Sequence, residues 1–599
     1  MLLSIFLLLL TLPAQSQNQD QNRDQTSWNL RSFHAAGDGR TSDTAALQKA
    51  IDQVSREHGM LVVPAGVYVI GTVELRSHMT LLLEHGAVLQ GSPRMADYGT
   101  IAQYGLDRRY GISSSGEGDR VGMLIARDAE DIRITGDGAI DGLGKSFFDP
   151  ATPHAGLDFD PSRTRSPDAF VKDIHRTDDG PLEVRSSGRP GTMLQFHHVR
   201  NVTIEGVTLR DAPNWTLHLQ HAQHVTIHAL RIDSDPRLPN NDAMDCMDCH
   251  DLRVSDSSFT AGDDDFAIVG SSDVAITNCT LESNSAAIRY ENSSDAVFSN
   301  LVIRSNRGIA IFAREGTYTR NALFQNIVIE TRLKHGHWWG KGEPIYIASS
   351  IRPGDPAVEA QRGQGESGTH PANVPAPAFI EAMSMASTVG GVVENLRFSD
   401  ILADADAGIL LEATHPGAVR DITLRNVRLR MHAPAPELAA SEGGNFDLRW
   451  TANTVADGIV RHDIPAVYAH NIDTLTVDGL EVSWPLPMVH VYTGPGSVPP
   501  PKRSNDLDDP YSRNPWPAYF TGAVEVHGFQ SVSLDRIHAG SRPDSTVAVV
   551  TLDDGNTATL RDSESTTAGQ PLLRVTGMRT PVFTSGNRPD TVLAKRARH

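Results

Sequence analysis

The stretch "VRNVTIEGVTLRD", Val199–Asp211, alternates apolar and polar residues on both sides of a glycine, as short β-strands joined by a turn do. The chain repeats this pattern, and further copies begin at Ala222, Cys249, Ser271, Ser293 and Arg320. Matching apolar positions lie 23, 27, 22, 23 and 26 residues apart, at Val202, Val225, Leu252, Val274, Val297 and Leu323. A period of this length with two or three short strands per unit predicts a stacked array of coils.

The length of the repeat narrows the choice of architecture. A propeller blade needs about 40 residues, and the signature of leucine-rich repeats is absent from this chain. We therefore predict an all-β fold, a parallel β-helix in which each repeat forms one coil and neighbouring coils pair about 4.8 Å apart. Asparagines tolerate the left-handed backbone of tight turns, and we expect them there at Asn201, Asn278, Asn300 and Asn326.

One helix is predicted, near the start of the chain. Ser42 or Asp43 can begin it and Gly59 can end it. Between them, apolar residues recur at helical spacing at Ala46, Leu47, Ala50, Ile51 and Val54. We expect this helix to cover the open end of the stack, which would otherwise expose unpaired strand edges.

The repeats divide the chain into a β-helix over residues 28–540 and C-terminal coils with a tail over residues 541–599. Stretches without the repeat are predicted to be loop insertions, near residues 96–120, 146–189, 334–392 and 493–520. Long loops on a rigid scaffold usually shape a binding cleft.

The first residues have the pattern of an export signal. An apolar run from Leu2 to Leu12 is too short to span a bilayer, and the small residues Ala14 and Ser16 follow it. We predict a signal peptide over residues 1–16, a polar linker over 17–27, and a secreted or periplasmic protein. The three cysteines, Cys246, Cys249 and Cys279, are too few for a disulfide framework, and buried thiols are expected.

The composition of the chain limits the classes of molecule that it can bind. The 599 residues are 39% hydrophobic and 21% charged, which is ordinary for a globular protein. The formal net charge of −20 argues against nucleic acid as a partner, because phosphate binding needs a basic surface. No later segment is long and apolar enough to span a membrane. We expect the protein to be a monomer.

Carboxylates are concentrated in "NNDAMDCMDCHDLRVSDSSFTAGDDDFAIVGS", Asn240–Ser271. Asp242 and Asp263 are separated by 263 − 242 = 21 residues, close to one coil, so both should project from the same flank with Asp264 beside them. Crowded carboxylates raise one another's pKa, so such a group can divide the roles of acid and base. A calcium site and turn-forming aspartates are the alternatives that the spacing leaves open.

The chain also resembles a known family. The motifs "FHAAGDGRTSDTAALQKAI", "VVPAGVYVIG", "LLLEHGAVLQGS", "ITGDGAIDGLG" and "VTIEGVTLRDAPNWTLHL" are similar to those of the polygalacturonases, glycoside hydrolase family 28, over about residues 30–330. The resemblance implies a right-handed parallel β-helix. The family's Asn-Thr-Asp and Gly-Asp-Asp segments correspond here to "NND" ending at Asp242 and "GDD" ending at Asp264. By resemblance, Asp263 is the general acid, while Asp242 and Asp264 activate the water that attacks with inversion.

The chain departs from this family at its cationic positions. Ala286 stands where the family has a histidine, and Ala310 and Phe312 stand at its Arg-x-Lys pair. In the family these cations help to bind the galacturonate carboxylate, so their loss puts a plain polygalacturonan substrate in doubt. Other charged and aromatic residues are candidates for binding the substrate: Arg289, Arg314, Trp338, Trp339, Lys341 and Glu343.

Together these observations predict a secreted glycoside hydrolase that cleaves α-glycosidic bonds in a pectic or related acidic polysaccharide, without a cofactor or metal. The insertions hint at exo action. The first alternative is a calcium-dependent polysaccharide lyase, with Arg289 as the base. The second is a carbohydrate-binding β-helix without catalysis, which the missing cations would suit.

Overall fold

The computed structural model describes residues 26–105, 119–153, 182–314, 316–334, 340–350, 391–413, 415–432, 463–484, 520–543, 545–589 and 592–594. The predicted signal peptide and nearly all of the predicted linker lie outside these ranges. Trp338 and Trp339 also lie outside them.

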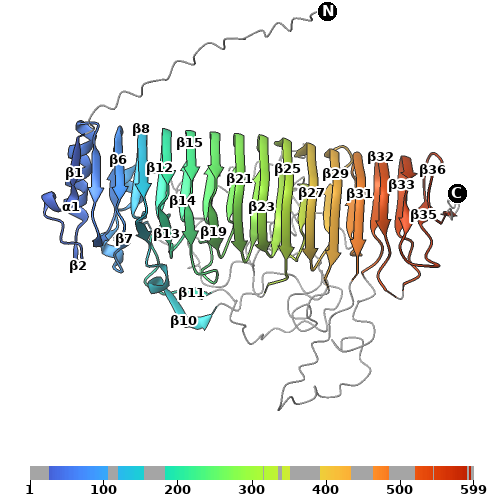
Figure 1. The fold of residues 1–599 in the computed structure, drawn as a ribbon, viewed down its shortest axis with the longest axis horizontal. Coiled ribbons are helices and arrows are strands. Elements are labelled where there is room, and N and C mark those ends of the chain that lie inside the picture. The colour runs from blue at the N-terminus through green and yellow to red at the C-terminus, as the bar shows by residue number, and fades with distance from the viewer. Residues whose placement is uncertain are drawn as a thin grey trace, which may run out of the picture.

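The described chain forms one long stack of parallel strands, shown side-on in Figure 1, and the predicted parallel β-helix is confirmed. Each full coil contributes a strand to each of three columns, which we call columns A, B and C. Column A begins with β5 (Val73–Leu75) and the first residues of β8 (Leu124–Gly136) and β12 (Leu194–Glu205). It continues through β14 (Leu217–Gln220), β17 (Met244–Met247), β20 (Phe266–Val269), β22 (Ala286–Glu291), β24 (Arg307–Arg314), β26 (Ile345–Ser350), β28 (Ile409–Ala413), β30 (Val467–His470), the first parts of β32 and β33, β35 (Leu573–Thr576) and β37 (Val592–Ala594).

Columns B and C share several long strands that bend from one column into the other. Column B contains β1 (Ser27–Asn29), β3 (Met60–Val63), β6 (Met79–Leu83), the later parts of β8 and β12, β15 (Gln223–His228), β18 (His250–Ser255), β21 (Ser272–Ser283), β23 (Ser294–Ser305), β25 (Tyr318–Thr331), β27 (Val392–Ala405), β29 (Val419–Met431), β31 (Thr474–Ser483), β32 (Val524–Ala539), β33 (Val550–Arg561) and β36 (Phe583–Ser585). Column C contains β2 (Asp38–Ser42), β4 (Gly66–Ile70), β7 (Ala87–Gly91), β9 (Ala139–Asp141), β13 (Thr208–Arg210), β16 (Arg231–Asp233), β19 (Ser258–Ala261), the later parts of β21, β23, β25, β27, β29, β31 and β32, and β34 (Glu564–Ser565).

The register confirms most of the predicted alignment and corrects its end. Val202, Val225, Leu252 and Val274 pair in sequence, as expected. In the next two coils, however, the matching residues are Ala296 and Ala322, not Val297 and Leu323. A slip of one residue turns a strand's side chains to its other face, so Val297 points outward and is 39% exposed. The small alanines fill the interior, a position that an alignment by hydrophobicity overlooks.

The interior of the stack is a continuous apolar core. Phe298, Phe324 and Phe398 occupy one row of it, with ring centroids 4.7 and 4.9 Å apart and rings nearly parallel, at 4° and 9°. All three are fully buried. The cysteines are free and buried in the same stack, as predicted.

Left-handed asparagines and aspartates form the corners between strands. The four asparagines predicted there have φ between 55° and 57°. At the corner between columns B and C, which we call the B–C corner, their side chains link successive coils: Asn426 Nδ2 donates to Asp400 Oδ1 at 3.0 Å, and Asn326 Nδ2 to Asn300 Oδ1 at 3.2 Å.

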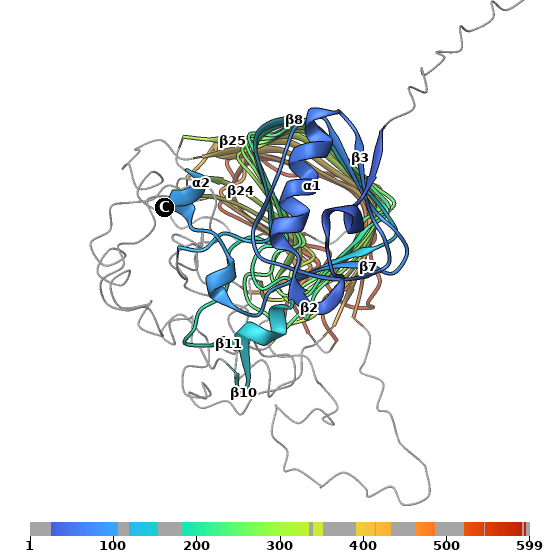
Figure 2. The ribbon, with the colours of Figure 1, turned by 90° about the vertical axis from the view of Figure 1, so that its left-hand side faces the viewer.

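Helix α1 (Thr44–Arg56) lies across the first coils, where Figure 2 shows it covering the end of the stack. Its buried residues Leu47, Ala50, Ile51 and Val54 join the core of the β-helix, as predicted. Asp43 precedes the helix, but its carboxylate accepts bonds from the amides of Ala36 and Gly37 and does not cap the helix. The left-handed residue after the helix is His58, with φ 51°, not the predicted Gly59.

Short elements lie in or beside two of the predicted insertions. The first contains η2 (Met95–Asp97) and α2 (Ile101–Tyr104), and the second contains a hairpin of β10 (Phe148–Pro153) and β11 (Leu182–Val184). Two further 3-10 turns are η1 (Leu30–Phe33) and η3 (Gly144–Phe147). Residues 433–462, between β29 and β30, are another long connection, which the repeat spacing did not mark.

Strand pairing continues from β32 into β33 without a break, so the stack extends beyond residue 540. Among the residues that the structure describes, none of the helices has the length and apolar character needed to cross a membrane.

Candidate active site

Column A presents polar and charged side chains on its outer face. Along each strand, alternate residues enter the core, as Met244 and Cys246 do on β17 and Phe266 and Ile268 on β20. The residues between them face outward. In register from β12 to β24, one outward row reads Gln195, His218, Asp245, Ala267, Arg289 and Ala310.

Three predicted carboxylates meet at the edge of this face. One oxygen from each of Asp242, Asp263 and Asp264 lies within 4.8 Å of the other two. All three side chains are buried. Asp242 directly precedes the coil of β17 and the other two precede that of β20, so a single lap of the chain brings them together.

Asn241 fixes the two loops that carry these acids. Its Oδ1 accepts bonds from the backbone amides of Gly262, at 2.6 Å, and Asp263, at 3.3 Å. Its Nδ2 donates to the Asp235 carbonyl at 3.0 Å. A Cβ at position 262 would lie only 2.4 Å from the Leu238 carbonyl oxygen, so glycine is required there. The loop before β20 is thereby locked onto the previous coil.

Burial raises the pKa of all three acids. For Asp242 the pKa rises well above its ordinary value, with further increases from Asp245, Asp263 and Asp264. Burial and the neighbouring charge of Asp263 raise the pKa of Asp264 to about 8, so Asp264 holds a proton at neutral pH. Burial also raises the pKa of Asp263, but bonds from Ser285 and the Asn240 amide, together with Arg289, oppose the rise.

Asp245 is a fourth acid that the sequence analysis did not select. It is buried on β17, three residues after Asp242, and it faces outward between His218 and Ala267. Burial and the charge of Asp264 raise its pKa well above the ordinary value. The signal for it was in the sequence, because the second residue of a strand that begins at a core methionine must face outward.

Arg289 is the cation beside this group. Its guanidinium donates to the Glu291 carboxylate at 2.7 and 3.1 Å, and the charge of Arg289 lowers the pKa of both Asp263 and Asp264. It therefore offsets part of the repulsion among the acids. Its side chain remains 24% exposed.

Another predicted binding residue, Glu343, forms a buried ion pair with Arg307, which the sequence analysis missed. Arg307, on β24, donates to both oxygens of Glu343 at 3.1 and 3.2 Å. The backbone amide of Lys341 donates to Glu343 at 2.7 Å. Lys341 and Glu343 are both buried, and Arg307 also lies over the ring of Tyr346, 3.9 Å from its centroid. The charge of Arg307 also lowers the pKa of Asp264, by less than that of Arg289 does.

Ala286, Ala310 and Phe312, which stand where the resemblance predicts cationic residues, belong to an apolar cluster. Its members are Ala286, Ala310, Phe312, Tyr346, Ala348, Leu410 and Tyr468. This cluster follows the acids along column A toward the C-terminal coils. The predicted binding residues Trp338 and Trp339 and the side chain of Arg314 are outside the described structure.

The three acids also have the spacing of a cation site, since carboxylate oxygens within 4.8 Å of one another can bind a hard divalent ion. Arg289 opposes such binding, because its positive charge already acts on Asp263 and Asp264. The geometry therefore suits acid–base chemistry and, less well, a calcium ion.

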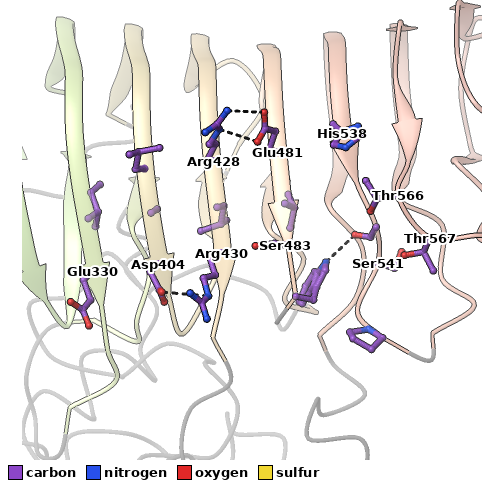
Figure 3. Close-up of a pocket in the computed structure, with 18 of the residues that line it drawn as sticks. Glu330, Asp404, Arg428, Arg430, Glu481, Ser483, His538, Ser541, Thr566 and Thr567 are labelled. Atoms are coloured by element: carbon purple, nitrogen blue, oxygen red, sulfur yellow. Dashed lines mark hydrogen bonds and ion pairs between the residues drawn. The ribbon is translucent and has the colours of Figure 1, made fainter. Parts of the chain in front are cut away.

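An open groove of about 1020 Å³ lies elsewhere, along column C of the later coils. Figure 3 shows Arg428 paired with Glu481, and Arg430 with Asp404, along it. None of the four acids lines this groove, so its size does not mark the site of chemistry.

Two families match separate parts of the chain. The family described as "Glycosyl hydrolases family 28" matches residues 181–284, which include all four acids. The one described as "Rhamnogalacturonase A/epimerase, pectate lyase-like" matches residues 27–122.

Curated relatives match the chain at low identity. A probable polygalacturonase of Vitis vinifera is 28% identical over 250 residues, which are 40% of this chain and 44% of the relative. An exo-poly-alpha-D-galacturonosidase of Dickeya chrysanthemi is 26% identical over 319 residues, 50% of each chain. The chain thus spans about half the length of the curated relatives it matches.

Solved structures are similar at still lower identity. An exopolygalacturonase from Thermotoga maritima is 19% identical, with a TM-score of 0.47 over 68% of this chain and 87% of that one. The tailspike protein of E. coli bacteriophage HK620 is 12% identical, with a TM-score of 0.45 over 94% of this chain and 80% of that one.

Proposed function

We propose that the chain is a distant relative of the family 28 glycosyl hydrolases, within the pectate lyase-like β-helix superfamily, and that it hydrolyses α-glycosidic bonds in a pectic or related acidic polysaccharide. The observation that carries this proposal is the meeting of Asp242, Asp263 and Asp264, with one oxygen of each within 4.8 Å of the others.

The protonation of the group supports acid–base catalysis. Hydrolysis needs one protonated carboxyl for the leaving oxygen and one carboxylate to activate water. The raised pKa of Asp264, about 8, keeps a proton within the group at neutral pH. Asp263, the general acid by resemblance, lies directly beside it, and its hydrogen bonds favour the charged form in the free protein. In this proposal Asp264 passes its proton to Asp263, which donates it to the leaving oxygen. The Asp264 carboxylate that results, held beside Asp242, takes the proton of the attacking water.

Inversion at the anomeric carbon is part of the proposal and rests on the resemblance alone. Inverting enzymes usually hold their two carboxyl groups about 6.5–9.5 Å apart, to leave room for water. Here the closest oxygens lie within 4.8 Å. The stereochemical outcome is therefore a question separate from the hydrolysis itself.

We also propose exo action and export. The length of the insertions in the sequence and the name of one relative, exo-poly-alpha-D-galacturonosidase, support exo action. The apolar run from Leu2 to Leu12 supports secretion or delivery to the periplasm.

The test compares Asp263→Asn with a control, Asp251→Asn. Asp251 is a half-buried aspartate that pairs with His224 on column B. We expect wild type and Asp251→Asn to release reducing ends from pectic oligosaccharides, and Asp263→Asn to lose at least about a thousandfold in kcat while it folds normally. Full activity in Asp263→Asn would contradict the proposal.

The calcium-dependent lyase is the second candidate, favoured by the spacing of the three acids. It would give unsaturated products that absorb in the ultraviolet and that disappear after chelation.

A further inference from the structure

An apolar row crosses the outer face of column C on three neighbouring coils. Val302, Val328 and Leu402 pair in register on β23, β25 and β27, and they are 36%, 47% and 49% exposed. In the part of the chain that the structure describes, six large hydrophobic side chains are exposed, and half of them lie in this row. Exposed apolar side chains that are contiguous, not scattered, indicate a surface that another molecule covers.

A charged row runs beside the apolar row, two residues further along each strand. From β21 to β29 it reads Glu282, Arg304, Glu330, Asp404 and Arg430, so the charges are negative, positive, negative, negative and positive. Some neighbours already pair within the chain, Arg304 with Glu330 at 3.9 Å and Arg430 with Asp404 at 3.7 Å. Both arginines stay 54% exposed, so a second carboxylate can reach each of them.

The two rows are complementary to a second copy of themselves that is turned end to end. A two-fold axis parallel to β25 sets β23 opposite β27 of the second copy, and β21 opposite β29. The apolar row then lies against the apolar row of the second copy. In the charged row Glu282 faces Arg430, and Arg304 faces Asp404, and the symmetry makes each contact twice.

Other placements of the axis lose this match. An axis between β25 and β27 would set Glu330 against Asp404 and Arg304 against Arg430, and like charges in contact disfavour association. An axis along the stack would set the apolar row on the charged row. The axis through β25 leaves one like pair, Glu330 against its own copy, and Arg304 of the same chain lies 3.9 Å from that carboxylate. The charges therefore select a single register.

The groove along column C has room for side chains of the second copy. Its lining includes Asp404, Arg430 and two members of the apolar row, and Figure 3 shows the two charged side chains next to each other. In the end-to-end arrangement the exposed side chains of Glu282 and Arg304 of one chain enter the groove of the other. There each of them meets a lining residue of opposite charge.

The length of column C limits the size of this contact. Five described strands follow β25 in the column, namely β27, β29, β31, β32 and β34, and at least as many precede it. At about 4.8 Å per coil, the overlap of the two copies is about 50 Å long. Strands about 13 Å long then cover roughly 650 Å² of each copy, near the lower limit for a stable interface. We therefore expect a dissociation constant in the micromolar range.

We propose that the protein forms a two-fold homodimer through column C, with the two stacks antiparallel and Val328 at the axis. The occupant is a second copy of this chain, because the order of charges along the row is complementary to its own reverse. This proposal replaces the monomer expected from the sequence. It is independent of the proposed hydrolysis, since the four acids lie on column A and at its edge.

The test is sedimentation equilibrium of the full chain over about 1 to 100 µM, a range that brackets a micromolar dissociation constant. We expect wild type to approach twice the mass of one chain within this range. Val328→Asp sets two carboxylates opposite each other at the axis and should weaken association at least about tenfold. Val297→Asp is the matched control, because Val297 is 39% exposed on column B of β23, and it should associate as wild type does.

An exchange of charges distinguishes a contact between chains from one within a chain. Glu282 and Arg430 lie four coils apart in one chain, about 19 Å at about 4.8 Å per coil, so they do not touch there. Glu282→Lys and Arg430→Glu should each weaken dimerisation about fivefold, because each sets like charges together. The double variant should recover an affinity within about twofold of wild type.

Wild type that stays monomeric at the highest concentration would overturn the proposal, and so would a dimer that Val328→Asp leaves intact. If Val328→Asp also lowers the melting temperature, the charge exchange decides, and a double variant that recovers no affinity would overturn the proposal. A monomeric wild type whose binding of hexagalacturonate is weakened by Val328→Asp would assign the groove to a saccharide, and the dimer would be wrong.

Discussion

Arg307 and Glu343 form an ion pair with two hydrogen bonds, and their side chains are only 5% and 4% exposed. Burial alone would raise the pKa of Glu343, but Arg307 and the Lys341 amide lower it below its ordinary value. The pair fastens the segment before β26 to β24, on the coils next to the acids. Glu343 therefore has a structural partner, whatever contact it makes with substrate.

Removing one member of this pair should destabilise the protein strongly. Arg307→Met leaves a buried, unpaired carboxylate, and we expect a loss of about 3–5 kcal/mol in the free energy of unfolding, measured with guanidinium chloride. Arg307→Met with Glu343→Leu should recover much of it. Arg428→Ala breaks the exposed pair with Glu481 and should cost at most about 1 kcal/mol. Equal losses in Arg307→Met and Arg428→Ala would contradict the burial argument.

The crowded acids should make the protein less stable as pH rises. The pKa of Asp264 is about 8 in the folded protein, against an ordinary value of 3.8. Below about pH 4 both folded and unfolded states hold the proton; between about 4 and 8 only the folded state does, so stability falls across this window and levels off above it. Asp264→Asn should weaken this fall and raise the melting temperature at pH 8, while activity is lost.

Asp251→Asn is the control for that measurement. The bond from His224 lowers the pKa of Asp251. Ionisation of Asp251 therefore makes the protein more stable as pH rises, and it does so at lower pH than the fall due to Asp264. A steep fall in stability between pH 4 and 8 that persists unchanged in Asp264→Asn would show that other groups cause it.

Chelation should leave activity unchanged. In the proposed mechanism the acids carry protons and bind no ion, so dialysis against EDTA should alter kcat/KM by less than about twofold. Added calcium should inhibit if it binds the acids, because it would displace the proton. A loss of activity on chelation, restored by calcium, would favour the lyase.

The stereochemistry of the first product can be followed by proton NMR. We expect the anomer opposite to that of the substrate, as the family resemblance implies. Retention would instead agree with the short spacing of the carboxylates and would make one of the three acids a nucleophile.

The phenylalanine row should contribute strongly to stability. Phe324 stacks between Phe298 and Phe398, so Phe324→Ala opens a cavity between two coils and should cost about 3–5 kcal/mol. Phe583→Ala, at a site 60% exposed, should change stability by less than about 0.5 kcal/mol. Denaturant unfolding of the two variants provides the comparison.

Sequence spacing predicted the features that depend on the period of the chain. The meeting of Asp242 with Asp263 follows from one lap of the coil, and the left-handed Asn278 follows from turn chemistry. Features that depend on side-chain partners were not predictable this way. Arg307 pairs with Glu343, 36 residues further along the chain in a predicted insertion, and nothing in the local sequence marks the pair.

The register error has a similar origin. Hydrophobicity favours Val297 over Ala296 as the interior residue, but the register pairs Ala296 with Val274 and turns Val297 outward. Asp245 was missed because the spacing argument considered only acids about one coil apart, although its place on β17 determines its direction.

The left-handed residues at the B–C corner restrict where residues can be inserted into this chain. The chain passes that corner through one residue per coil, such as Asn278, Asn300 and Asn326, and the long connections after β9, β25, β26, β29 and β31 all fall at the other corners. Growth by insertion is thus confined to the sides that flank column A. Longer or shorter connections at these corners would change the surroundings of column A without altering the stack that positions the four acids.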